Sequence, residues 1–122
     1  MSTNILLRGL AIPEQGALWT EGGEAQFIFT DALPHKFLLR IKTNGAFGPN
    51  VGGVFTVVVD NIEREFIGPP GAKEVDLHFV LKTKTNSILI ITPRPTSPFE
   101  LGATSDSRKL GLSIRGLDII AE

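Results

Sequence analysis

Apolar and polar residues alternate along several short stretches of the chain. The clearest run covers residues 75–82, where every odd position is apolar and every even position except Val80 is polar. Residues 25–30 and 37–42 follow a similar pattern. Period-two alternation predicts β-strands with one face on a core and one in water. No long window shows the 3.6-residue period of an amphipathic helix.

Turn-forming residues separate these stretches. Residues 55–59 form a nearly continuous apolar run that ends in Asp60-Asn61. Because these two residue types tolerate positive φ, they predict a tight hairpin into residues 62–67. Residues 87–92 form a short apolar strand that the next prolines end, since proline cannot donate to a ladder.

The last apolar stretch changes parity along its length. Even positions are apolar from Leu110 to Ile114, whereas Leu117 and Ile119 have the opposite parity. A β-bulge at Arg115-Gly116 reconciles the two halves, because one extra residue moves side chains to the other face. We expect this last strand to pair with a first strand within residues 5–12.

The spacing of strands and turns predicts the fold class. Eight or nine short strands, with turn signals every 8–12 residues, indicate an all-β, antiparallel, jelly-roll-like β-sandwich. A chain of 122 residues is expected to form a single domain over residues 1–122.

Composition excludes several classes of function. The net charge is −1 and the 12 Lys and Arg residues are scattered, so we expect no nucleic-acid partner. The chain has no cysteine, which rules out disulfides and thiolate chemistry. No apolar run approaches the roughly 18 residues that span a bilayer, so no direct membrane insertion is expected. None of these features fixes the compartment.

No motif with a catalytic mechanism is present. The histidines, His35 and His78, have no partner motif for zinc or catalysis, and no serine lies in a Gly-x-Ser-x-Gly turn. Aspartates are available for calcium, but they follow no loop motif. The sequence therefore predicts a non-enzyme with no catalytic residues, no metal and no cofactor.

The polar, turn-rich segment 96–111 is the longest loop in the sequence. Long ordered loops on a β scaffold often carry binding residues. Asp106 and Arg108 form its most polar cluster, and Arg94 is held stiffly between two prolines. Arginine binds anionic oxygens in a forked geometry, so the pair holds either a sugar or phosphate, or the loop itself through an internal salt bridge.

Two further residues are candidates for ligand contact. Trp19 lies among glycines, which indicates a loop or edge position suited to stacking on a sugar; the alternative is that it caps one end of the core. Asn50 lies in a predicted turn, where its amide either faces a ligand or hydrogen-bonds its own backbone. The phenylalanines mostly fall on the apolar phase of strands, which favours core packing.

Several motifs together resemble a known family. In chain order they are WTEG (19–22), LPHKFLLRI (33–41), AFGPNVG (46–52), PRPTSP (93–98), ELG (100–102) and DSRKLG (106–111). They resemble the C-terminal β-sandwich accessory domain of bacterial cell-envelope glycosyltransferases and phosphoglycerol-transferase-like proteins. The resemblance implies a non-catalytic domain in a bacterial envelope, with the transferase chemistry in another domain.

Two functions follow as expectations. The first is an accessory module similar to a carbohydrate-binding module, whose glycan site comprises Trp19, Asn50, Arg94, Asp106 and Arg108. The second is a structural domain without a ligand, which docks on its parent transferase or self-associates through a sheet edge. The scarcity of aromatic residues favours the second, and an exposed tryptophan in a polar groove would favour the first.

Overall fold

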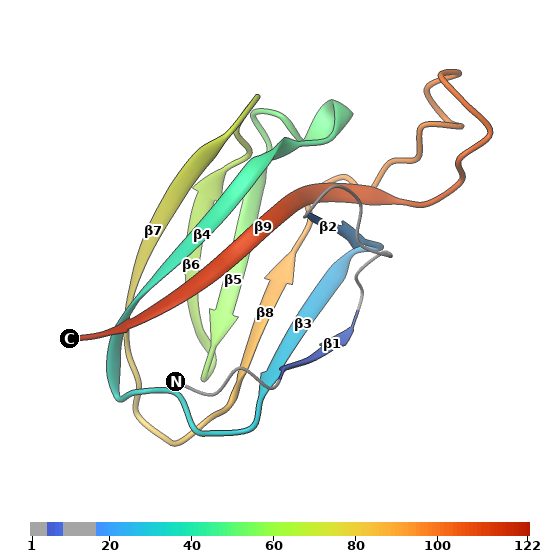
Figure 1. Cartoon of the computed structure of the whole chain (residues 1–122). Coiled ribbons are helices and arrows are strands. Elements are labelled where there is room, and N and C mark those ends of the chain that lie inside the picture. The colour runs from blue at the N-terminus through green and yellow to red at the C-terminus, as the bar shows by residue number, and fades with distance from the viewer. Residues whose placement is uncertain (1–4, 9–16) are drawn as a thin grey trace.

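The computed structural model of the chain describes residues 5–8 and 17–122 (Figure 1). The strands in these residues are β1 (Ile5–Arg8), β2 (Leu18–Glu21), β3 (Glu24–Phe29), β4 (Lys36–Ala46), β5 (Val54–Val59), β6 (Ile62–Ile67), β7 (Lys73–Val80), β8 (Ser87–Ile91) and β9 (Leu110–Ala121). A short 3-10 helix, η1 (Gly48–Asn50), follows β4.

The strands form two antiparallel sheets that face each other (Figure 1). One sheet has five strands in the order β1-β3-β8-β5-β6, and the other has four in the order β2-β9-β4-β7. Every strand pair in both sheets is antiparallel. The predicted all-β antiparallel sandwich is confirmed.

The core lies between the sheets and follows the alternation in the sequence. The odd positions of β7 are buried from Val75 onward, while Val80, the exception in the pattern, is 51% exposed. Phenylalanine rings pack in pairs inside the core. Phe37 and Phe79 stack with ring centroids 5.4 Å apart, and such pairs add to the stabilisation from apolar burial.

Two local predictions are confirmed. The turn between β5 and β6 has positive φ at Asp60 (52°) and Asn61 (60°), as a two-residue hairpin requires. The register of β4 with β9 passes from Lys42 opposite Gly116 to Thr43 opposite Ile114. Arg115 is therefore left without a partner on β4, and the bulge moves the downstream side chains to the other face.

The predicted pairing of the first and last strands is wrong. In the described residues β1 pairs with β3, and residues 9–12 of the predicted strand lie outside the described part. β9 lies between β2 and β4 and pairs with both, so both of its edges are occupied. Alternation identifies the buried face of a strand, but it does not identify the neighbouring strand.

Candidate functional site

One end of the sandwich gathers the residues that the sequence singled out. We call it the loop end; it comprises η1, the β8–β9 connection (residues 92–109) and the adjoining parts of β2 and β9. In Figure 1 the orange β8–β9 connection projects well beyond the sheets at this end. Asn50 lies in η1, Arg94, Asp106 and Arg108 lie in the connection, and Trp19 lies in β2 beside the start of β9.

Trp19 lies on an edge strand and faces outward. It pairs with Ser113 of β9, whose neighbours Leu112 and Ile114 point into the core. Residues opposite each other on paired strands share a face, so Trp19 lies on the outer face. Its half-buried ring is 5.9 Å from the ring of Phe47, centroid to centroid, at an interplanar angle of 88°.

The side chain of Asn50 is fully buried and is occupied by main-chain partners. Its Nδ2 donates to the carbonyl oxygens of Phe47 (2.8 Å), Arg94 (2.8 Å) and Leu110 (3.3 Å), and its Oδ1 accepts from the Arg94 N–H at 2.9 Å. An amide nitrogen has two protons to donate, so this group has no donor left for a ligand. Asn50 therefore links three segments of the loop end.

Glycines allow the chain to pack closely around Asn50. A Cβ at Gly68 would lie 2.1 Å from the carbonyl oxygen of Asn50, a distance that no side chain tolerates. A Cβ at Gly53 would lie 3.2 Å from the same oxygen and 2.9 Å from Pro93 Cγ. The close backbone approach at these positions explains the choice of glycine.

Arg94 has a fixed main chain and an exposed side chain. Its N–H and carbonyl are both bound to Asn50, and the carbonyl also accepts from Thr96 Oγ1 at 2.7 Å. Within residues 5–8 and 17–122, no group forms a hydrogen bond or ion pair with its guanidinium. The loop end thus presents an exposed cationic side chain on a rigid main chain.

Asp106 and Arg108 bind each other. Arg108 donates from Nε to Oδ1 at 3.0 Å and from Nη2 to Oδ2 at 2.6 Å, and its main-chain N–H also donates to Oδ1 at 3.0 Å. The hydrogen bonds from Arg108 lower the pKa of the Asp106 carboxyl. The arrangement is an internal ion pair. It orders residues 106–109, which we call the returning limb of the connection because they lead back to β9.

The rest of the β8–β9 connection is also tied internally. Thr96 and Leu110 close its base with two main-chain hydrogen bonds, of 2.9 and 3.1 Å, and Glu100 forms an ion pair with Lys109. Two large apolar side chains nevertheless stay in water, since Phe99 is 63% and Leu101 53% exposed. The connection forms an arm that is tied largely within itself, and Leu101 also lies close to Gly48 of η1.

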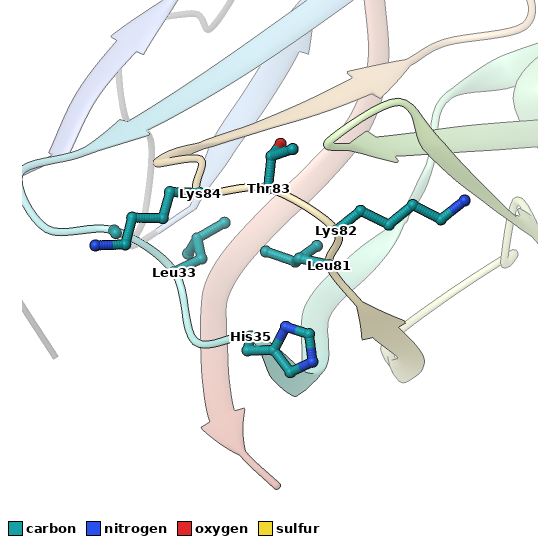
Figure 2. A pocket seen from close by; sticks show the side chains of 7 residues that line it. Leu33, His35, Leu81, Lys82, Thr83 and Lys84 are labelled. Carbon is teal, nitrogen blue, oxygen red and sulfur yellow. The ribbon is translucent and has the colours of Figure 1, made fainter.

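A hollow of about 280 Å³ lies at the opposite end of the sandwich. Leu33 and Leu81 form part of its wall, and His35 lies beside them (Figure 2). Figure 2 also shows Lys82 and Lys84 extending away from each other. Because its charged groups do not converge, this hollow is a weaker candidate for a polar ligand than the loop end.

The part of the chain that the structure describes contains no group of three or more His, Cys, Asp or Glu residues placed to hold a metal ion. No helix within residues 5–8 and 17–122 has the length and apolar character needed to cross a membrane.

Phe47 was not predicted as a site residue. The sequence places it in a Phe-Gly-Pro-Asn turn, directly after a strand, and its side chain belongs neither to the core cluster nor to the half-buried residues packed on it. Its place in a turn after the strand was the available signal, although its odd position continues the buried phase of β4. Its proximity to Trp19, 28 residues earlier in the sequence, is visible only in the fold.

Comparison with known proteins identifies the family. Residues 4–121 match the family described as "Domain of unknown function (DUF7024)", and the chain belongs to this family. It is also 31% identical over 116 residues to the proteins named Phosphoglycerol transferase I from Salmonella typhimurium (strain LT2), Salmonella typhi and Salmonella newport (strain SL254). The similarity covers 92% of this chain but 15% of each relative. The predicted resemblance to phosphoglycerol-transferase-like proteins is confirmed.

Proposed function

We propose that this chain is a non-catalytic accessory domain that binds glycan at its loop end. It serves an enzyme of the bacterial cell envelope that acts on polysaccharide or transfers phosphoglycerol. The similarity to 15% of phosphoglycerol transferase I supports the association with a transferase. In this proposal the transfer chemistry belongs to the region of such proteins that the chain does not match.

The observation that carries the proposal is the Trp19–Phe47 pair. Both rings are half-buried, and both lie outside the core cluster. Tryptophan offers a large flat surface with one polar group, which suits the apolar face of a sugar ring together with its hydroxyls. Most ligand sites combine such apolar surfaces with a few fixed polar groups.

The remaining predicted residues take different roles in this site. Arg94 is the exposed hydrogen-bond donor for sugar hydroxyls or an anionic substituent. Asp106 and Arg108 contact the ligand while they remain paired with each other. The carboxylate oxygens of Asp106 still have lone pairs that accept hydrogen bonds from hydroxyls. Asn50 acts as a positioning residue, because its amide holds the main chain of Arg94.

Tryptophan fluorescence tests this proposal, because Trp19 is the sole tryptophan. The 122-residue chain is titrated with envelope oligosaccharides and with phosphoglycerol, and calorimetry follows the same mixtures. We expect a saturable change with at least one glycan, weakened about tenfold by Arg94→Gln, the loss of one charged hydrogen bond. Arg115→Gln, an exposed arginine at the bulge, is the matched control and should leave binding unchanged. Absence of any signal or heat with every ligand would contradict the proposal.

A second candidate function is docking on the parent transferase. It is favoured by Phe99 and Leu101, which are exposed on the arm, because exposed apolar patches mark interaction sites. Substituting both residues with serine should then abolish co-purification with the transferase and leave the fold intact. Unchanged co-purification would exclude Phe99 and Leu101 as the docking surface.

A further inference from the structure

We propose that Phe47 forms the second aromatic wall of the glycan site, and that this site accepts the terminal sugar of a chain in preference to an internal one. The inference rests on the proposed glycan-binding function. It adds a contact residue and a class of ligand to that function.

The main chain of Phe47 is fixed by three hydrogen bonds. Its N–H donates to the Gly111 carbonyl at 2.8 Å, and its own carbonyl accepts from Asn50 Nδ2 at 2.8 Å and from the Asn50 N–H at 3.1 Å. The ring that this rigid main chain carries is only half-buried and lies outside the core cluster. Core packing therefore does not account for a phenylalanine at this position.

The two rings stand perpendicular to each other, with 88° between their planes and 5.9 Å between their centroids. Coplanar rings make a flat platform over which a glycan chain extends in both directions. Edge-to-face packing is common for aromatic pairs. In the proposed corner, one of the two perpendicular rings stacks on the sugar and the other stops the chain. A corner therefore favours a sugar that ends a chain.

Asn50 connects this corner to the exposed cation. The same buried amide bonds to the Phe47 carbonyl and to both main-chain groups of Arg94. The main chains that carry the Phe47 ring and the Arg94 side chain thus belong to one rigid frame, which lowers the cost of ordering them on binding. Substitution of Asn50 should disturb both contacts together.

Phe99 provides the matched control. It is also a phenylalanine of the loop end, but it is 63% exposed. Among the residues that the structure describes, it has no ring partner. A loss of affinity from Phe47→Leu and not from Phe99→Leu therefore reports the corner rather than general apolar character.

The test measures binding of the 122-residue chain by calorimetry and Trp19 fluorescence. The probes are the methyl glycosides of glucose, galactose and N-acetylglucosamine, and linear oligomers of glucose and N-acetylglucosamine with two to six units. We expect Phe47→Leu to weaken the best ligand about tenfold, Phe47→Tyr to restore affinity, and Phe99→Leu to change it less than about twofold. Affinity should not increase from dimer to hexamer, because one terminal sugar fills the site.

The outcomes separate this inference from the proposed function. Two results would contradict the proposed corner and leave the glycan function standing. One is that Phe47→Leu binds glycan as well as the unmodified protein, and the other is that affinity rises steeply with glycan length. If no probe binds, both are overturned. Near-ultraviolet circular dichroism verifies that each variant is folded, and should Phe47→Leu unfold, the length dependence of the unmodified chain decides alone.

Discussion

The β8–β9 connection is held by two kinds of polar contact that differ in burial. At its base, the Asn50 amide is fully buried and bonds to three main-chain segments. In its returning limb, Asp106 and Arg108 form a forked ion pair whose side chains remain 28% and 29% exposed. Both contacts order the same loop, but only the first is sealed from water.

The difference in burial sets the expected energies. Removing one partner of a buried hydrogen bond leaves its counterpart without water, which costs about 1–3 kcal/mol. An exposed ion pair gains little, because solvent screens it and also replaces it when it breaks. The contacts of Asn50 should therefore behave as part of the core, whereas the Asp106–Arg108 pair should contribute little to stability.

Crowding the close packing around Asn50 is expected to produce the largest loss of stability. Gly68→Ala places a methyl group 2.1 Å from the Asn50 carbonyl oxygen and 2.8 Å from Phe55 Cε1, so the backbone must shift, at a cost of about 3 kcal/mol. Urea denaturation measures the loss. Gly71→Ala is the matched control, because its methyl group would meet nothing within 4 Å. Equal stability of the two variants would show that the base is not closely packed.

Removing the buried amide should have the next largest effect. Asn50→Ala is expected to lower the free energy of unfolding by about 2 kcal/mol. The carbonyls that it binds keep other donors, whereas the Arg94 N–H loses its acceptor. The exposed Asn44→Ala, compared in the same urea titration, should change stability by less than about 0.5 kcal/mol. A neutral Asn50→Ala would mean that water replaces the amide.

The smallest effect is expected in the returning limb, and it depends on pH. Arg108 lowers the pKa of Asp106 in the folded state. A lowered pKa stabilises the fold above the unfolded-state value, about 3.9, and this contribution disappears as pH falls through the folded-state pKa. The urea midpoint of the natural chain should thus slightly exceed that of Asp106→Asn at pH 7, and the gap should close as pH falls through the folded-state pKa of Asp106. A gap independent of pH would contradict the ion pair.

Local sequence patterns predicted the faces and turns of the strands well. The Asp60-Asn61 hairpin and the bulge at Arg115 were readable because each is set by residues next to one another in the chain. The partner of the first strand was predicted wrongly. Alternation carries no information on neighbours, and β9 uses both of its edges for β2 and β4.

The candidate site was predictable in part, for the same reason. Trp19 was expected in a loop or at an edge, or else as a cap on the core, and it lies on the edge strand β2. The role of Asn50 depends on Arg94 and Leu110, which are 44 and 60 residues away in the sequence. Phe47 gains its meaning only from its contact with Trp19. Such long-range contacts leave no trace in local periodicity.

Backbone NMR measures directly whether the loop end binds glycan. The ¹⁵N-labelled chain is titrated with the linear glucose and N-acetylglucosamine oligomers, and shifts of the amide and indole signals are mapped. We expect saturable shifts of the Trp19 indole and of the Phe47 and Arg94 amides, with the hollow around Leu33 and Leu81 unaffected. Shifts confined to that hollow, or no shifts at all, would contradict it.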